Sequence, residues 1–308
     1  MTLENHKPNA LIFGSTGFLG SYLCQSLEET FNLFRVVRKQ KNIFSVLNAD
    51  RCLIKSSISY NGIEEIFNSN RFDIVFNAAG YVNVEECAKH PDVNRLANLQ
   101  LPTWLAKFCK KHHTKFIHYS TDAVFGQEGT MFNEEMKPIP ISDYGKSKFL
   151  AEQNILGIDS SALIIRTNFF GWANNKKSLF NYFYDGFEKQ NKVIGYTNSY
   201  FTPIYVKDLV DFSRKMSLAD STGIYHVCGS ERISKHEFGM KILENFFPQQ
   251  GILLEGKMIN NSLSTSRNFE MCLDNSKLVK QFGTISHYTN GIKEIRKLIP
   301  QGGANENR

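Results

Sequence analysis

The feature that most constrains the fold of this chain is a glycine-rich turn between an apolar run and an amphipathic stretch. The apolar run is Ala10-Leu11-Ile12-Phe13, and the amphipathic stretch is 21–29. Glycines at this spacing permit a tight turn and a close approach of backbone to ligand, and a helix that begins there offers free N–H groups to a pyrophosphate. A turn without a ligand is the alternative, but the strand before it and the helix after it favour nucleotide binding. The residues that we predict to bind the nucleotide are Gly14, Ser15, Thr16, Gly17, Phe18, Leu19 and Gly20.

Further apolar runs recur along the first half of the chain, each followed by a longer amphipathic stretch. They lie at 34–37, 72–76, 115–119 and 162–165. Parallel strands joined by helical crossovers form a doubly wound sheet, the Rossmann arrangement, which binds ligands at the carboxyl ends of its strands. We predict an α/β fold with a dinucleotide-binding domain over 1–166, its sheet completed by about 204–228, and a smaller C-terminal α/β substrate-binding region over 167–203 and 229–308.

The composition narrows the class of ligand. The 308 residues carry a formal charge of +6, but lysine and arginine are spread along the chain, which favours a small anionic ligand over nucleic acid. The six cysteines show no CxxC or metal-like spacing, so we expect buried free thiols and no metal site. No apolar stretch approaches the roughly 20 residues of a membrane span, and the first residues lack the apolar core of a signal peptide. We therefore expect a cytoplasmic protein that does not associate with membranes.

The end of the second predicted strand indicates which dinucleotide is bound. An Asp or Glu at this place usually holds the ribose hydroxyls of NAD. Here the sequence reads Val36-Val37-Arg38-Lys39, and the two cationic side chains would attract the 2′-phosphate of NADP. A solvated basic loop is the alternative. We predict NADP(H) as the cofactor, with Arg38 and Lys39 near its 2′-phosphate.

Small and polar residues follow two later strands. The segment Asn77-Ala78-Ala79-Gly80 would let a cofactor lie flat at the edge of the sheet, although a plain turn has the same composition. Thr121 follows the strand at 115–119, and Tyr144 and Lys148 are four residues apart, which places both on one face of a helix. A cation near the hydroxyl favours the phenolate, so Tyr144 becomes a usable proton donor or acceptor near neutral pH. A solvated surface pair is the alternative interpretation.

Together these motifs resemble those of the extended short-chain dehydrogenases, and most closely those of the dTDP-4-dehydrorhamnose reductase group. The resemblance continues through Arg166-Thr167-Asn168, 201–209, 223–227 and 234–238, and so covers nearly the whole chain. It implies hydride transfer between a nicotinamide and C4 of a nucleotide-linked 4-keto sugar, with Tyr144 as the acid. Lys148 would hold the nicotinamide ribose and lower the pKa of Tyr144. Thr121 would orient the carbonyl, and Asn98 would complete a proton relay unless it is a helix-surface amide.

The resemblance also implies further contacts. Thr167 would touch the cofactor. The residues that would touch the sugar nucleotide are Val82, Thr121, Asp122, Asn168, Phe169, Phe201 and Arg267. Two helices, 102–110 and 146–154, resemble those that pack between subunits in this family, which implies a homodimer.

A departure from the family pattern leaves the substrate open. Ala123 stands where many rhamnose-type reductases carry Tyr, and where the related 4,6-dehydratases carry the Glu of elimination, so dehydration is disfavoured. A sugar-nucleotide epimerase would share the fold, the cofactor and the Tyr144/Lys148 pair. A non-catalytic NADP-binding regulatory subunit is a third possibility, against which the intact Thr121, Tyr144 and Lys148 argue.

Overall fold

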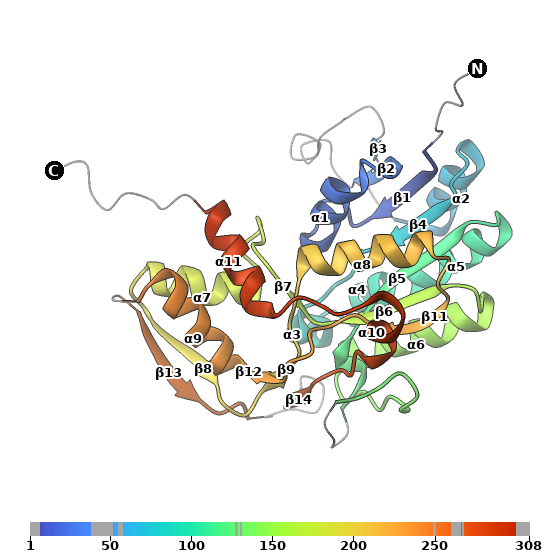
Figure 1. Cartoon of the computed structure of the whole chain (residues 1–308). Helices are drawn as coiled ribbons and strands as arrows, with labels where there is room; N and C mark the ends of the chain where they lie inside the picture. The colour runs from blue at the N-terminus through green and yellow to red at the C-terminus, as the bar shows by residue number, and fades with distance from the viewer. Residues whose placement is uncertain are drawn as a thin grey trace.

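The computed structural model (Figure 1) describes residues 7–37, 52–54, 58–126, 129, 131–248, 251–259, 266 and 268–299. Within these residues the chain forms a seven-stranded sheet of order β11-β6-β5-β4-β1-β2-β3, in which every pair of neighbours is parallel. Its strands are β1 (Asn9–Phe13), β2 (Asn32–Val37), β3 (Cys52–Ile54), β4 (Ile74–Asn77), β5 (Lys115–Thr121), β6 (Leu163–Thr167) and β11 (Gly223–His226). The predicted doubly wound sheet is confirmed, and its strand order reverses between β1 and β4, where such sheets bind their ligands.

Helices cover both faces of this sheet. One face carries α1 (Phe18–Leu27) and α8 (Val206–Leu218), which lie side by side in Figure 1, and the other carries α2 (Tyr60–Ser69), α5 (Leu101–Lys111) and α6 (Asp143–Ile158). Alternate residues of β1 enter the two cores: Ala10 and Ile12 pack on the α1 side, and Leu11 and Phe13 on the other. Because both faces are buried, the strands are mostly apolar, as expected for parallel sheets.

Shorter elements connect these layers and build the second half. Before α6 the chain forms α3 (Val84–Lys89), α4 (Pro91–Arg95), a π-helical turn (Leu96–Gln100) and a 3₁₀ turn (Asp122–Val124). After β6 it forms β7 (Phe169–Phe170), α7 (Leu179–Glu188), β8 (Lys192–Tyr196), β9 (Tyr200–Phe201), β10 (Ile204–Tyr205), β12 (Ile233–Ser234), α9 (Lys235–Phe246), β13 (Ile252–Gly256), β14 (Glu270–Met271), α10 (Ser276–Phe282) and α11 (Tyr288–Leu298). Within the predicted 204–228 segment, β11 joins the main sheet beside β6, whereas β10 pairs with β7 outside it.

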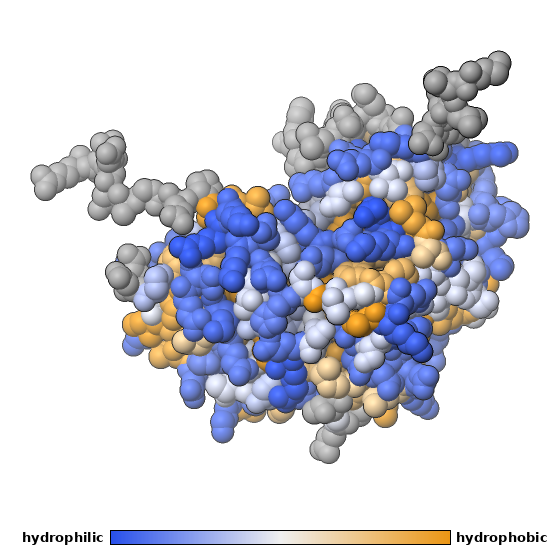
Figure 2. Space-filling view, viewed as in Figure 1, coloured by the Kyte–Doolittle hydropathy of each residue, from blue (hydrophilic) through white to orange (hydrophobic). Residues whose placement is uncertain are grey.

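The second half forms a lobe at one side of the sheet, on the left in Figure 1. It is built from α7, α9 and α11, with the parallel pair β8 and β13 on its outer side. The hydroxyl of Tyr182 donates to the carbonyl oxygen of Ile194 (3.2 Å) and accepts from its N–H (3.3 Å), so it occupies the edge of β8 that faces away from β13. The surface in Figure 2 is mostly hydrophilic, and hydrophobic side chains gather at this outer edge, where Ile194, Ile252 and Leu254 are exposed.

The cysteines lie where the sequence suggests. All six are free, five are buried, and Cys52 is partly exposed. In the described part of the chain, no three His, Cys, Asp or Glu side chains are grouped closely enough to hold a metal ion. No described helix has the length and apolar character that a membrane crossing requires.

Candidate active site

The glycine turn after β1 is packed too tightly for any side chain. Gly14 has φ +78°, and a Cβ there would lie 2.6 Å from the backbone nitrogen of Ala79. A Cβ at Gly20 would lie 2.0 Å from the carbonyl oxygen of Gly14. The N–H of Gly17 donates to that same oxygen (2.9 Å), which closes the turn. The three glycines therefore hold the start of α1 against the end of β4, with the backbone itself as the surface.

The start of α1 is open to a ligand. Among the described residues no side chain caps it, whereas α2, α6, α7 and α9 each begin with a serine that accepts a backbone N–H bond. Its first turn also contains no acidic residue. Free N–H groups and the positive end of the helix dipole favour an anion, and a diphosphate fits this cradle.

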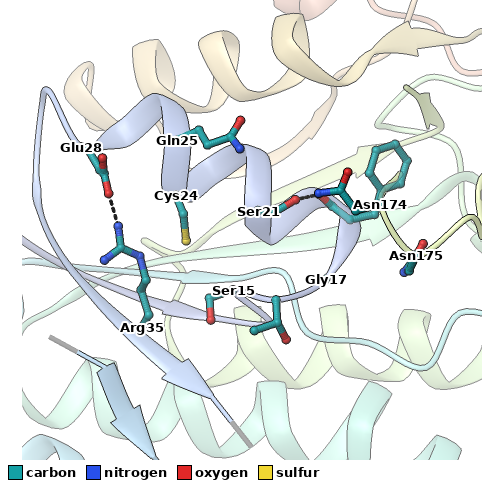
Figure 3. A pocket seen from close by; sticks show the side chains of 11 residues that line it. Ser15, Gly17, Ser21, Cys24, Gln25, Glu28, Arg35, Asn174 and Asn175 are labelled. Carbon is teal, nitrogen blue, oxygen red and sulfur yellow. Dashed lines mark hydrogen bonds and ion pairs between the residues drawn. The ribbon is translucent and has the colours of Figure 1, made fainter. Parts of the chain in front are cut away.

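A cavity of about 150 Å³ extends from this turn along α1 (Figure 3). Ser15 lies at its floor and donates to the carbonyl oxygen of Val36 (3.0 Å). Arg35, on β2, is almost fully buried in its wall and forms an ion pair with Glu28 of α1. Asn174 lies on the opposite side. The cavity therefore adjoins the predicted nucleotide site, and the Arg35 charge in its wall is already matched by a carboxylate.

Some predicted residues lie outside the described part of the chain. These are Arg38, Lys39 and Arg267. The structure places the glycine turn, the segment 77–80 and Thr167 at the carboxyl ends of β1, β4 and β6, and the predicted cofactor residues Tyr144 and Lys148 on α6. Thr167 ends β6, and its buried hydroxyl has no hydrogen-bond partner among the described residues, as expected of a group that serves a ligand.

Thr121 and Tyr144 meet at the carboxyl end of β5. Thr121 is the last residue of that strand. Its hydroxyl donates to Oδ1 of Asp122 (2.9 Å) and is also in hydrogen-bond contact with the hydroxyl of Tyr144 on the first turn of α6. Gly145 makes this approach possible, because a Cβ at Gly145 would lie 2.2 Å from the carbonyl oxygen of Ala123. Ser142 caps the helix by accepting the N–H of Gly145 (3.1 Å). The sequence Tyr-Gly at this point therefore brings the phenol onto the strand end.

The environment of Tyr144 keeps its phenol protonated. Burial raises its pKa well above the usual value, while the hydrogen bond with Thr121 acts in the opposite direction and the nearby Asp122 adds to the rise. The expected lowering of this pKa by Lys148 is not observed. The physical reason is that removing the phenolate from water outweighs the other effects.

Lys148 lies one turn further along α6 and faces the sheet rather than Tyr144. Its Nζ donates to the carbonyl oxygen of Tyr119 (2.6 Å) and lies 3.0 Å from Nε2 of His118. Burial lowers its pKa to about 8, against the opposing effect of Glu152. Tyr144 and Lys148 do share one buried face of α6, as the spacing predicts, but in this structure their polar ends have different partners.

His118 joins Lys148 to the predicted cofactor turn. It lies on β5, is 1% exposed, and its Nδ1 is 3.1 Å from Nδ2 of Asn77 at the end of β4. The Oδ1 of Asn77 accepts the N–H of Ala79 (3.2 Å). A chain of contacts therefore runs from Lys148 through His118 and Asn77 into the turn 77–80. Burial, with the charge of Lys148, holds the pKa of His118 well below its usual range, so its ring is neutral.

A second buried cluster lies further along α6. Glu152 accepts two hydrogen bonds from Nε of Arg166 (3.1 and 3.2 Å) and one from Nη2 (2.7 Å), and both side chains are 2% exposed. The hydroxyl of Ser120 also donates to Glu152. Nη1 of Arg166 lies 3.3 Å from Nε2 of His226, whose Nδ1 is 2.9 Å from the carbonyl oxygen of Phe132. This cluster fastens α6 to β5, β6 and β11.

Of the predicted substrate residues, Thr121, Asp122, Asn168 and Phe169 lie at or just after the ends of β5 and β6. Burial raises the pKa of Asp122, although Asn168 donates to its Oδ2 (3.0 Å). Phe169 follows on β7, and Phe201 on β9 is buried. Val82 belongs to the loop after β4 and is 69% exposed, so it is free to contact a ligand.

Asn98 is not a helix-surface amide. It is fully buried in the π-helical turn, where its Nδ2 donates to the carbonyl oxygen of Tyr81 (2.7 Å) and to Oδ1 of Asn94 (2.8 Å). Its Oδ1 accepts the N–H of Tyr81 (3.0 Å). The side chain is thus occupied in fixing the loop after β4, and its part in a proton relay stays a prediction.

Sequence reasoning missed three residues of this region, His118, Glu152 and Arg166, as members of a connected polar network. A signal was present, because each interrupts an apolar pattern: His118 and Arg166 lie inside apolar strands, and Glu152 lies on the α6 face that carries Tyr144 and Lys148. A polar side chain at a buried position needs a partner. The sequence does not show which partner each one takes.

Comparisons with known proteins identify the family of this chain. The family model described as RmlD substrate binding domain matches residues 8–299. A relative from Haloferax volcanii, a probable low-salt glycan biosynthesis reductase, is 26% identical over 279 residues, which are 89% of this chain and 92% of the relative.

Solved structures share the fold at lower identity. A dTDP-4-dehydrorhamnose reductase from Bacillus anthracis, in complex with NADP, has a TM-score of 0.82 at 20% identity and covers 95% of this chain and 100% of its own. A UDP-glucuronic acid 4-epimerase from Bacillus cereus, in complex with NAD, has a TM-score of 0.80 at 19% identity, with coverages of 94% and 100%. The same architecture thus carries a reductase and an epimerase.

Proposed function

The chain belongs to the RmlD substrate binding domain family, and from that premise we propose that it reduces a keto group of a nucleotide-linked sugar with NADPH. The observation that carries this proposal is the contact between Thr121 and Tyr144 at the carboxyl end of β5, the edge of the sheet at which the open start of α1 also lies. The substrate class follows that of the dTDP-4-dehydrorhamnose reductases.

The residues present fit a dinucleotide. Gly14 and Gly20 leave no space for a Cβ. Among the described residues, no side chain caps the start of α1 and the buried hydroxyl of Thr167 has no hydrogen-bond partner. When bound, NADPH supplies the hydride that goes to the carbonyl carbon. Lys148 would contact the nicotinamide ribose, as the family resemblance implies. Its Nζ must then exchange or share one of its present partners, His118 or the Tyr119 carbonyl.

Tyr144 supplies the proton in this proposal. Its raised pKa keeps the phenol protonated at neutral pH. Tyr144 therefore already carries the proton that it donates as a general acid when the substrate binds. To orient the carbonyl oxygen, the hydroxyl of Thr121 would turn its proton toward that oxygen and away from Oδ1 of Asp122, to which it donates in the structure (2.9 Å). The carbonyl oxygen then takes the proton from Tyr144 as the carbon takes the hydride, and the product is an alcohol.

The preference for NADP over NAD rests on Arg38 and Lys39, which follow β2. We expect NADPH to bind more tightly than NADH, and Arg38→Ala to reduce that ratio, because the guanidinium would pair with the 2′-phosphate. Binding is measured by fluorescence titration of both cofactors. Equal affinities that Arg38→Ala leaves unchanged would contradict the NADP assignment.

The function is tested by following NADPH oxidation with a panel of nucleotide-linked 4-keto sugars, with product stereochemistry from NMR. We expect oxidation with one or more of them, and loss of oxidation in Tyr144→Phe while NADPH binding is retained. An epimerase would instead retain tightly bound NAD(H) and show no net oxidation of added NADPH. A non-catalytic subunit would show neither, and Tyr144→Phe would change nothing. The homodimer is tested separately by light scattering.

A further inference from the structure

The contact between Lys148 and His118 restricts where protons can be placed. A neutral imidazole has one N–H donor and one acceptor nitrogen. Nε2 faces Nζ of Lys148 at 3.0 Å, and Nδ1 faces the Asn77 amide at 3.1 Å. The proton on the ring therefore serves one neighbour and the lone pair serves the other. The charge of Lys148 decides whether the ring proton faces Lys148 or Asn77.

If Lys148 is protonated, it can only donate. Nε2 of His118 then accepts, the ring proton lies on Nδ1, and Asn77 must present its oxygen to that proton. In this state the Oδ1 of Asn77 turns away from the N–H of Ala79, which it accepts in the present arrangement. The charged state thus releases one backbone bond of the turn that adjoins the glycine turn.

If Lys148 is unprotonated, the contacts reverse. Nε2–H of His118 donates to the amine, Nδ1 accepts from Nδ2 of Asn77, and Oδ1 of Asn77 keeps the N–H of Ala79. The amine still donates to the Tyr119 carbonyl. This state has one proton fewer than the charged one, and solvent takes that proton. The orientation of Asn77 in the structure is the one that suits this state.

We propose that His118 is a positioning residue, which holds the Lys148 side chain through Nε2 and links the charge of Lys148 to the orientation of Asn77 and so to the turn 77–80. The proposal rests on the proposed function for the role of Lys148 in the reaction, but the link itself requires no substrate. Because Nε2 of His118 and Nζ of Lys148 are in direct contact, a change in the charge of Lys148 must be accompanied by a change in the tautomer of the ring.

Among the described residues, few other charges act on this pair. Glu152, one turn along α6, favours the protonated form of Lys148, and Lys148 is the charge that acts on His118. Around the ring, Asn77 of β4 and the stacked ring of Phe116 (centroids 6.2 Å apart) carry no charge. A pH dependence of the His118 ring therefore reports on Lys148.

The link is tested on the free protein by NMR of ¹⁵N-histidine-labelled samples, in which long-range correlations show which ring nitrogen carries the proton. The His118 signal is the one missing from His118→Gln. We expect its proton to move from Nδ1 to Nε2 around the pKa of about 8 to which burial lowers Lys148, and no such move in Lys148→Met. A ring that becomes doubly protonated, or one that keeps its tautomer from about pH 6 to pH 10 in the wild-type protein, would overturn the proposal.

The consequence for the reaction is tested by the pH profile of kcat. His118→Leu removes the acceptor of the ammonium, so we expect the alkaline limb to move down by about one pH unit or more. His118→Gln keeps an acceptor and should keep the limb near that of the wild-type protein. Phe116→Leu, on the same face of β5, is the structural control and should lower thermal stability without moving the limb. An unmoved limb in His118→Leu overturns the proposal. Absence of any carbonyl reduction overturns the proposed function and leaves the NMR result standing.

Discussion

Two buried histidines stand beside buried cations, His118 next to Lys148 and His226 next to Arg166, and their surroundings differ. At His226 the cation cannot lose a proton, so Nε2 always accepts, and Nδ1–H has the carbonyl oxygen of Phe132 as its acceptor. Only one arrangement of protons fits. At His118 the cation can lose a proton and the amide of Asn77 can turn, so two arrangements fit.

The charges differ in the same way. Arg166 is paired with Glu152, which cancels its charge inside the protein. Lys148 has a neutral ring and a carbonyl as partners, and burial lowers its pKa to about 8. A buried ion pair is costly to break, whereas an unpaired buried cation loses its proton readily. One helix, α6, therefore carries a fixed anchor at Glu152 and a titratable group at Lys148.

The largest expected effect is on the chemistry, at the end of α6 that adjoins Lys148. We expect Tyr144→Phe to lower kcat by about 10³- to 10⁴-fold, because it removes the general acid. Its free energy of unfolding should change by less than about 1 kcal/mol, since the ring stays in place. Steady-state kinetics and urea unfolding measure the two quantities. A variant that loses stability rather than turnover would show that this end of α6 is structural.

Arg166→Met removes the anchor. We expect the free energy of unfolding to fall by about 3 to 5 kcal/mol, because Glu152 is left as a buried charge without its partner. Urea unfolding measures the loss. The double variant Arg166→Met with Glu152→Leu should recover most of it, since neither charge remains. If the double variant is as unstable as the single one, the loss of stability does not come from an unpaired charge on Glu152.

Lys148→Met should change how stability depends on pH. The pKa of Lys148 lies near 8 in the folded protein and at 10.5 in an unfolded chain. Between these values the unfolded chain holds a proton that the folded protein has lost. Stability of the wild-type protein therefore gains about 3 kcal/mol relative to the variant as the pH rises through this window. Urea unfolding of both proteins across the window measures the gain. Parallel curves would contradict a lowered pKa.

His226 should make the protein sensitive to acid. Burial lowers its pKa from 6.5 to about 3, so below pH 6.5 only the unfolded chain takes up the proton and stability falls with pH. Between neutral pH and about pH 5 the wild-type protein should lose about 2 kcal/mol more than His226→Gln. Unfolding curves at the two pH values provide the comparison. An equal loss in both proteins would assign the acid sensitivity elsewhere.

The sequence predicts the fold well because the fold rests on patterns that are local. Ala10 to Phe13 is apolar throughout, as both faces of a parallel strand require, and Gly14 and Gly20 stand where no Cβ fits. The pairing of Tyr144 with Thr121 could also be anticipated, since the helix start and the strand end meet at one edge of the sheet.

The hydrogen-bond partners of the side chains in the site could not be predicted from local sequence patterns. The spacing of Tyr144 and Lys148 places both on one buried face, but whether Nζ turns to the phenol or to the sheet depends on His118, which comes from another strand. The sequence leaves open whether Asn98 completes a proton relay or is a helix-surface amide, because its burial depends on the loop at Tyr81 packing over it. Such contacts join residues that are distant in sequence, and the local hydrophobic periodicity does not predict them.

The hydroxyl of Tyr182 has a consequence for how molecules of this protein meet one another. An exposed strand edge can pair with a strand of a neighbouring molecule. The exposed side chains of Ile194, Ile252 and Leu254 would stabilise such pairing by hydrophobic contacts. At Ile194 the side-chain hydroxyl already occupies both the N–H and the carbonyl that an incoming strand would need. At Ile194, a neutral hydroxyl and not a charged side chain thus blocks the pairing of this edge of β8 with a strand of another molecule.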